Sequence, residues 1–249
     1  MWYKKLLFFC IFASFLPANA QQITVRYTAM DSSFSALPKL DSLVMPFRLQ
    51  IQQEMDKPLT YLAEDLLKAK PMGKLGQFCA DALLQEAKKA QIAGACKAQI
   101  AVLTPGGLRK PLAKGALTKG DLFELMPFEN ALSILEIKGS VLQELVAYIV
   151  ARQGLPFAGM TIQEKNGKIA VKINQKNLQS DAKYCVATLD YLASGGDGMD
   201  LWQKADKRTD AKHILFRNML MDAFSQQDTL RITLDPRIIL STENHEKTR

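Results

Sequence analysis

The sequence predicts a mixed fold of the α+β class, in which sheet packs against helices, and three observations carry this prediction. Two short, continuous apolar runs, 99–103 and 184–188, are typical of strands buried within a sheet. Apolar side chains recur at helical spacing between residues 74 and 89. Asn166-Gly167 separates two apolar segments and favours a tight hairpin turn between strands.

The first 20 residues are expected to be a signal peptide rather than part of the fold. Lys4 and Lys5 precede an apolar run, 6–16, and Ala18-Asn-Ala20 supplies the small residues of a cleavage site. The apolar run is shorter than the roughly 20 residues of a transmembrane helix, and no second run of spanning length follows. We therefore expect an exported protein, periplasmic or secreted, without a transmembrane segment.

The charge pattern gives little support for nucleic-acid binding. The formal charge is +7 and falls to +5 (7 − 2) without Lys4 and Lys5. The Lys residues are scattered, with no basic run and no stripe interleaved with aromatics. A mild positive charge would suit an anionic ligand, and it would equally serve solubility. The remaining length fits one domain, which we place at 41–240, after an N-terminal extension at 21–40 and before a charged tail at 241–249.

The predicted elements begin with weak signals and become clear at the first amphipathic helix. Residues 23–27 have strand-like character, and 41–66 is interpreted as helical pieces interrupted by Pro46 and Pro58. A clear helix follows at 74–89. Its apolar face carries Leu75, Phe78, Cys79, Ala82, Leu83 and Ala87.

A rigid turn, Met126-Pro127-Phe128, joins a polar lead-in from Gly120 to an apolar strand at 131–137. Pro127 fixes its own φ and pushes Met126 into an extended conformation, so Phe128 has a defined direction. An aromatic on a stiff turn, with the amide of Asn130 two residues on, can stack on a flat ring and hydrogen-bond to its ligand. The alternative is that Phe128 fills a core, as most Phe side chains do.

Loops rich in glycine follow both buried strands. The strand at 99–103 leads to Gly106-Gly107-Leu108-Arg109, where paired glycines let the backbone approach a ligand closely. The strand at 184–188 leads to the Gly-Gly-Asp-Gly loop at 195–198. Taken alone, Asp197 and its glycines could simply form a tight turn between two elements.

The remaining elements complete the domain. Ser140 with Gln143 predicts a capping box for a helix closed by Gly154. A helix at 213–224 and a strand at 230–234 follow the second glycine loop. The hairpin at Asn166-Gly167 is expected to bury one side, formed by Met160, Ile162, Ile169, Val171 and Ile173.

The cysteines and histidines offer no metal or catalytic centre. Without the signal peptide the chain keeps Cys79, Cys96 and Cys185, each in or beside an apolar segment, and buried free thiols are expected. A bond between Cys79 and Cys96 remains open. There is no Cys-x-x-Cys and no Cys/His cluster, so no zinc site is implied. His213, in the predicted helix at 213–224, is expected to pack or face solvent rather than catalyse.

Three motifs in order resemble the C-terminal, substrate-binding domain of the 5′-nucleotidase family. They are Thr104-Pro-Gly-Gly-Leu-Arg109, Gly120-Asp followed by Pro127-Phe-Glu-Asn130, and Tyr191-Leu-Ala-Ser-Gly-Gly-Asp197-Gly198. The family carries Asn-Gly-Gly-Gly-Ile-Arg, Gly-Asp…Pro-Phe-Gly-Asn and Phe-Leu-Ala-x-Gly-Gly-Asp-Gly. The similarity extends to Lys70-Pro…Leu75-Gly-Gln-Phe…Asp81-Ala and to Asp235-Pro-Arg-Ile238, so it covers about 40–239. It implies a single domain with a layered α-β-β-α arrangement.

The resemblance also implies roles for individual residues. Phe128 and Tyr191 would sandwich a base, and Asp197 would accept hydrogen bonds from ribose hydroxyls. Arg109 would contact ribose or phosphate as an always-charged planar donor, and Asn130 would contact the sugar. Gly107 and Gly196 would bring the backbone close to the ligand. Two departures, Thr104 for Asn and Pro105 for Gly, put a base or sugar contact in doubt. The family's Arg before the first helix is also missing and is only flanked by Lys68 and Lys70.

The family's catalytic signatures are absent from the sequence. Family members hydrolyse phosphate esters with two metal ions, held in an N-terminal metallophosphoesterase domain. Its Asp-x-His, Gly-Asp-x-x-Asp, Gly-Asn-His-Asp/Glu and Gly-His-x-His motifs do not occur here, so we expect no catalytic residue, metal or cofactor on this chain. Three hypotheses follow. The chain is the nucleotide-binding half of a split 5′-nucleotidase whose metals sit in a separate metallophosphoesterase chain, a stand-alone exported nucleoside-binding module, or a structural remnant.

Overall fold

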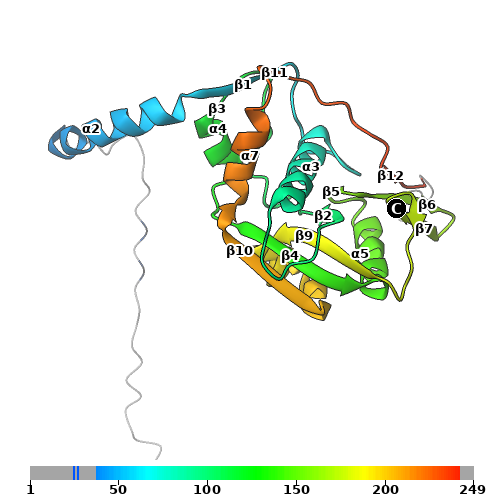
Figure 1. Ribbon diagram of the computed structural model, residues 1–249. Helices are drawn as coiled ribbons and strands as arrows, with labels where there is room; N and C mark the ends of the chain where they lie inside the picture. The colour runs from blue at the N-terminus through cyan, green and yellow to red at the C-terminus, as the bar shows by residue number, and fades with distance from the viewer. Residues whose placement is uncertain (1–24, 26, 28–37, 242–249) are drawn as a thin grey trace, which may run out of the picture. The chain divides into compact units, whose positions relative to one another are not determined.

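The computed structural model describes residues 25, 27 and 38–241 (Figure 1). The predicted signal peptide, nearly all of the N-terminal extension and the charged tail lie outside the described residues. The chain divides into two compact units, 1–46 and 47–249, and all elements after α2 (Pro38–Met55) belong to the second. Among the described helices, none has both the length and the apolarity needed to cross a bilayer.

The second unit is built on a five-stranded sheet with the strand order β10-β4-β9-β2-β5. The central strand β9 (Lys183–Leu189) runs parallel to β2 (Ile100–Val102) and antiparallel to β4 (Ala131–Lys138). Consequently β2 and β9 end at the edge of the sheet where β4 begins. The outer strands are β10 (Lys207–Leu215) and β5 (Phe157–Ala158), both antiparallel to their neighbours. This topology brings three loops to one edge.

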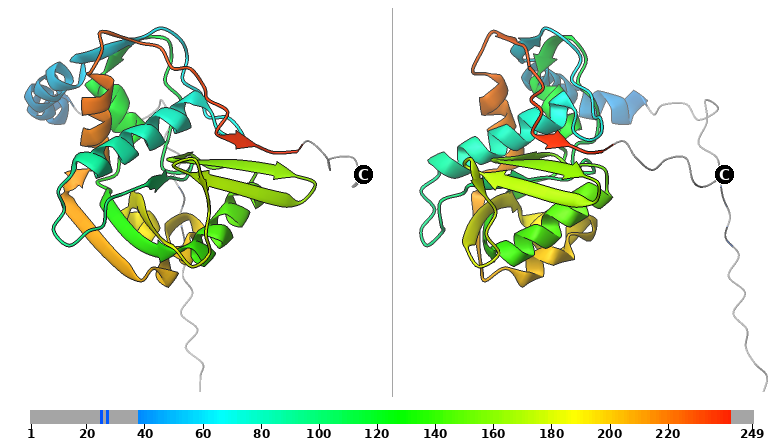
Figure 2. Two further views of the ribbon diagram at one scale, coloured as in Figure 1. Left: turned by 45° about the vertical axis from the view of Figure 1, so that its right-hand side comes forward. Right: turned by 90° about the vertical axis from the view of Figure 1, so that its right-hand side faces the viewer.

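Helices cover both faces of this sheet (Figure 2). The helix α3 (Lys74–Lys89) packs on β2, β5 and β9, and α5 (Gly139–Ala151) packs on β4 and β9. Because both faces are covered, β2 is buried throughout and β4 is buried along most of its length. The core is continuous from α3 through the sheet to α5. The predicted packing of sheet against helices is confirmed.

Two smaller sheets and several short helices complete the unit. One sheet has the order β11-β1-β3 and the other the order β12-β6-β7-β8. The strands are β1 (Pro58–Leu62), β3 (Gly115–Thr118), β6 (Met160–Lys165), β7 (Lys168–Ile173), β8 (Lys176–Asn177), β11 (Thr229–Leu230) and β12 (Ile238–Ile239). The helices are α4 (Lys119–Leu125), α6 (Asp190–Ala193), the 3-10 turns η1 (Gly196–Gly198) and η2 (Asp200–Lys204), and α7 (Phe216–Phe224).

The hairpin β6–β7 confirms the turn predicted at Asn166-Gly167, with one exception on its apolar side. Both turn residues have positive φ (52° and 74°), and the antiparallel register pairs Met160 with Ile173 and Ile162 with Val171. These four side chains are buried. Ile169 is 40% exposed, because it pairs with Glu164 near the tip, beyond the core.

Three local predictions around prolines and caps are wrong. The helix α2 passes through Pro46 without ending, although an interior proline removes one helix hydrogen bond and crowds the preceding turn. Pro58 begins the strand β1 instead of interrupting a helix. The helix α5 begins at Gly139, and Lys138 caps it without a side-chain hydrogen bond, so Ser140 and Gln143 form no capping box.

His213 lies in the strand β10 and not in a helix, which corrects a further prediction. The helix begins three residues later, at Phe216. β10 is an edge strand that exposes most of its side chains, so it lacks the apolar alternation by which a half-buried strand is recognised. The predicted strand at 230–234 is reduced to the short β11.

The prediction of free thiols is correct for Cys79 and wrong for the other two cysteines. Cys96 and Cys185 form a disulfide across 89 residues of sequence, with their Cα atoms 6.0 Å apart. Cys79 is a free, fully buried thiol on α3, and burial raises its pKa. The sheet explains the pairing. Gln99 hydrogen-bonds through backbone and side chain to Cys185, which brings the nearby Cys96 beside it.

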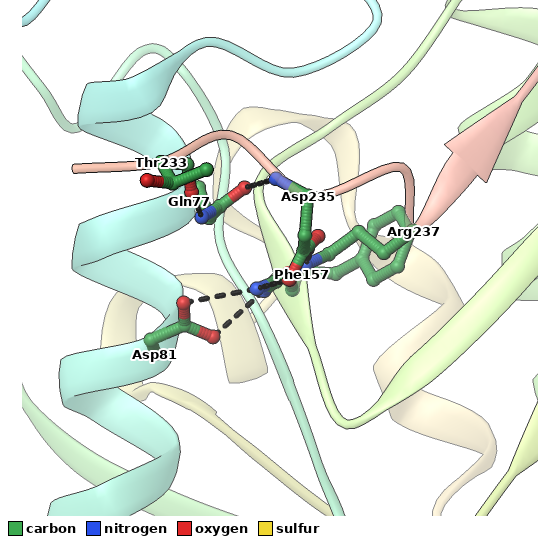
Figure 3. Close-up of polar contacts among 6 residues, drawn as sticks. All are labelled: Gln77, Asp81, Phe157, Thr233, Asp235 and Arg237. Atoms are coloured by element: carbon green, nitrogen blue, oxygen red, sulfur yellow. Dashed lines mark hydrogen bonds and ion pairs between the residues drawn. The ribbon is translucent and has the colours of Figure 1, made fainter.

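Arg237 ties the C-terminal segment to α3 through a cluster of carboxylates (Figure 3). Its guanidinium donates to both oxygens of Asp81 (2.7 and 3.0 Å), to both oxygens of Asp235 (2.5 Å each) and to the carbonyl of Phe157 (3.0 Å). Burial disfavours the Arg237 charge, yet the hydrogen bonds to the two aspartates outweigh it and raise its pKa. Gln77 adds two bonds to the same segment, at Thr233 and Asp235.

Replacement of Arg237 by Ala is expected to lower the free energy of unfolding by about 2 kcal/mol. This value lies between those of exposed and buried ion pairs, because the Arg237 side chain is 11% exposed and its partners are 37% and 49% exposed. Urea denaturation would measure the change. Arg231→Ala, at an exposed site of the same segment, serves as the control and should cost less than about 0.5 kcal/mol.

The same variant should change how stability depends on pH. The pKa of Asp235 lies below its ordinary value of 3.8, chiefly because Arg237 hydrogen-bonds to its carboxylate. A lowered pKa stabilises the folded state above the unfolded pKa, and this contribution is lost as the pH falls through the folded pKa. The stability difference between wild type and Arg237→Ala should therefore narrow below about pH 4. A constant difference down to pH 2.5 would contradict the assignment.

Candidate binding pocket

A pocket of about 210 Å³ opens at the sheet edge where β2 and β9 end and β4 begins. The loop after β2, the connection from α4 to β4 and the segment after β9 all contribute to its wall. Residues that line it are Leu103, Thr104, Gly106, Gly107, Leu108, Arg109, Met126, Phe128, Asn130, Leu189, Tyr191, Leu192, Asp197 and Phe216. Six of the seven predicted site residues are in this set, and Gly196 is not.

Two aromatic side chains line the pocket and remain open to solvent. Phe128 is 41% exposed and Tyr191 is 51% exposed, whereas the apolar residues at the pocket floor, Met126, Leu189 and Phe216, are buried. The guanidinium carbon of Arg109 lies 5.9 Å from the centre of the Phe128 ring, within cation–π range. Two exposed rings beside buried apolar residues are suited to a flat ligand.

The loop after Tyr191 places Asp197 at the pocket in a strained backbone conformation. Asp197 has φ 55°, and Gly195 and Gly198 on either side also have positive φ. Gly196 is not among the lining residues, and it packs so closely against Tyr191 that a Cβ there would come within 2.4 Å of the ring. A positive φ is energetically unfavourable for a residue other than glycine, and such residues occur often at functional sites.

Thr104 donates a hydrogen bond to one carboxylate oxygen of Asp197. The hydroxyl of Tyr191 lies 3.4 Å from the other oxygen. The departure from the family's Asn therefore leaves a polar partner for Asp197 in place. A Cβ at Gly106 would come within 2.8 Å of the Asp197 carboxylate, so a larger residue there would require that carboxylate to shift. At Gly107 a Cβ would contact nothing closer than 3.5 Å, so the surroundings would accommodate one.

Two residues that the sequence interpretation did not select hydrogen-bond to the backbone at or beside Phe128 and Tyr191. Arg217, on α7, donates to the carbonyls of Met126 (3.2 Å) and Phe128 (3.4 Å). Asp190 accepts from the backbone N–H of both Ala131 (3.0 Å) and Tyr191 (2.8 Å) through one oxygen. Asp190 directly precedes Tyr191 in the sequence, and this adjacency is the signal by which Asp190 could have been selected. Arg217 is 91 residues from Met126, so no local pattern could connect them.

No carboxylate or histidine cluster in the described part of the chain is suited to two catalytic metal ions. The group with ligand atoms close enough to share an ion consists of Cys96, Glu136 and Cys185. Its two sulfurs are bonded to each other, and none of the three residues lines the pocket. The described residues therefore do not fit the dimetal centre of a phosphoesterase, and no catalytic step is assigned to them.

Together these features form a pocket whose lining is suited to a flat ligand that carries polar groups. The model of the 5′-nucleotidase C-terminal domain family matches residues 64–204, which is more than half of the chain. The chain belongs to this family. The expected family and its mixed helix and sheet fold are thereby confirmed.

Individual relatives agree with this assignment. The chain is 32% identical over 157 residues to the trifunctional nucleotide phosphoesterase protein YfkN of Bacillus subtilis, covering 56% of this chain and 10% of the relative. It is 33% identical over 133 residues to a 5′-nucleotidase of Vibrio parahaemolyticus, covering 50% and 22%. The chain thus spans less than a quarter of the length of these two relatives.

Solved structures support the fold independently. The 5′-nucleotidase precursor of Thermus thermophilus superposes with a TM-score of 0.68 at 22% identity, covering 82% of this chain and 43% of the other. The NAD nucleotidase of Haemophilus influenzae superposes with a TM-score of 0.61 at 16% identity, covering 82% and 42%. At these sequence identities the structural similarity shows the fold alone.

Proposed function

We propose that this chain binds nucleosides or nucleotides in the pocket at the sheet edge. The observation that carries the proposal is the presence of two exposed aromatic side chains and one carboxylate in a single pocket. Phe128 and Tyr191 would stack on the base, as aromatic residues do in single-strand binding proteins. Asp197 and Asn130 would hydrogen-bond to the sugar.

Arg109 is proposed to recognise phosphate or ribose at the exposed side of the pocket. Its side chain has one weak backbone contact, 3.3 Å from Nη1 to the carbonyl of Gly106. Its remaining donors can therefore turn to a ligand, and a guanidinium pairs well with phosphate oxygens. Arg109 lines the pocket together with Gly106 and Gly107 of the same loop.

We further propose that the protein is exported and works as the nucleotide-binding half of a split 5′-nucleotidase. The match to the 5′-nucleotidase C-terminal domain family supports the nucleotide-binding part of this proposal. A separate metallophosphoesterase chain would supply the metal ions and the attacking water, because the described residues here do not fit a dimetal site. This chain would bind the nucleotide and orient its phosphate ester.

Calorimetric titration of residues 21–249 with adenosine and AMP would test the binding step. We expect saturable binding, with AMP tighter than adenosine, and Arg109→Gln should bring the affinity for AMP down to that for adenosine. Addition of the metallophosphoesterase chain should then yield AMP hydrolysis faster than by that chain alone. Equal rates with and without this chain would exclude the split enzyme.

A stand-alone nucleoside-binding module is the second candidate, and the pocket itself favours it. Phe128, Tyr191 and the Asp197 carboxylate already lie in one pocket of this chain, and these are the groups proposed to contact the base and the sugar. This candidate predicts the same titration result without stimulated hydrolysis. An absence of heat with either ligand would instead favour a structural remnant.

A further inference from the structure

We propose that Arg217 is a positioning residue that sets the direction of Phe128 by holding the turn Met126-Pro127-Phe128. The inference rests on the proposed nucleoside site and adds to it a residue that lies outside the pocket wall. Arg217 is not among the lining residues, but its neighbour Phe216 is. Helix α7 thus contributes one residue to the floor and one to the support behind Phe128.

The contacts of Arg217 are concentrated on the turn. It is 7% exposed, and Nη1 donates to the carbonyl oxygens on both sides of Pro127, at 3.2 Å to Met126 and 3.4 Å to Phe128. Its guanidinium carbon lies 4.1 Å from the centre of the Phe123 ring. The carboxylate of the exposed Glu129 is 3.8 Å from Nη2.

The turn has few other means of fixing its middle. Pro127 has no N–H to donate, so this turn has one backbone donor fewer than a turn without proline. Among the described residues, backbone hydrogen bonds fix the two ends of the turn, from the N–H of Met126 to the carbonyl of Leu122 and from the N–H of Phe216 to the carbonyl of Asn130. Arg217 supplies the donor at the centre, directly behind the backbone of Phe128.

A structural role alone explains this arginine poorly. Its Nε is buried and has no hydrogen-bond partner among the described residues. Burying a charged group with an unsatisfied donor is unfavourable, and apolar side chains of similar volume often replace such groups at no cost in stability. The planar guanidinium can bond to the turn carbonyls while stacking on Phe123, which an ammonium cannot do. We infer that the arginine serves the geometry of the turn.

The test is a double-variant cycle on adenosine affinity, measured by equilibrium dialysis on the protein without its signal peptide. Arg217→Met should weaken adenosine binding about tenfold. The affinity of Arg217→Lys should lie between that of Arg217→Met and that of wild type. In a Phe128→Ala background, Arg217→Met should change affinity less than twofold. In an Asp197→Asn background it should still cost about tenfold. The proposal would be overturned if Arg217→Met lowered adenosine affinity equally in the Phe128→Ala and Asp197→Asn backgrounds. It would also be overturned if Arg217→Met did not lower the affinity of the otherwise wild-type protein.

A measurement without ligand separates this inference from the nucleoside proposal. In a Trp202→Phe background, F128W is the single tryptophan of residues 21–249. Arg217→Met should lower the fluorescence anisotropy of this reporter while far-UV circular dichroism shows that the fold is kept. If the anisotropy falls but adenosine does not bind to wild type, the positioning role holds and the proposed function fails. Unchanged anisotropy in the folded variant would overturn the positioning role.

Discussion

Phe128→Ala is expected to weaken adenosine binding about 10- to 100-fold, and Tyr191→Ala by a similar factor. Stacking of one base on one aromatic ring contributes about 1–3 kcal/mol, and each 1.4 kcal/mol is a factor of ten in affinity. Both rings are exposed in the pocket, so their removal creates no buried cavity and should leave the fold intact. Calorimetric titration would give the affinities.

Matched variants make this result specific to the pocket. Tyr61 is 46% exposed and lies on β1, away from the pocket lining, so Tyr61→Ala should leave the affinity unchanged. Phe128→Tyr and Tyr191→Phe keep a ring and should bind within about threefold of wild type. If Phe128→Ala binds adenosine as tightly as wild type, base stacking at this position is wrong.

Removal of the disulfide is expected to have the largest effect on stability. The bond between Cys96 and Cys185 closes a loop with a sequence separation of 89 residues. A cross-link over a loop of this length reduces the entropy of the unfolded chain by an amount worth about 4.6 kcal/mol. The double variant Cys96→Ala/Cys185→Ala should therefore unfold at a markedly lower urea concentration than wild type.

Two comparisons check the origin of that loss. Wild type in excess dithiothreitol should unfold at the same urea concentration as the double variant, because both lack only the cross-link. The adenosine affinity of the double variant should be unchanged under native conditions, since the bond is at the beginning of β9 and the pocket is at its end. A variant as stable as oxidised wild type would show that the bond contributes nothing.

Elements with a strong periodic signal could be predicted, and those set by distant pairing could not. The helix at 74–89 and the turn at Asn166-Gly167 have local causes, an apolar stripe and residues that accept positive φ. The edge strand β10 was missed because its side chains are mostly exposed and it is held by pairing with β4. Likewise, the partner of Cys185 was decided by the register of β9 against the segment at Gln99.

The residues that line the pocket could be predicted from the sequence, whereas the residue that contacts the turn from behind, Arg217, could not. Phe128, Tyr191 and Asp197 follow recognisable local motifs, and the sheet topology brings them to one edge. Arg217 is a charged residue on an amphipathic helix, which from sequence suggests a solvated face. Only the packing of α7 on α4 reveals that it is buried behind the turn. The stacking and sugar contacts remain predictions.

The disulfide also decides what a single proteolytic cut would do to the molecule. The peptide chain from Cys96 to Cys185 is a covalent ring that contains most of the pocket lining and the exposed hairpin tip at Asn166-Gly167. A protease that cleaves this tip opens the ring, but both halves stay joined through the sulfur–sulfur bond. The nicked protein would therefore migrate as one species in a non-reducing gel and as two after reduction.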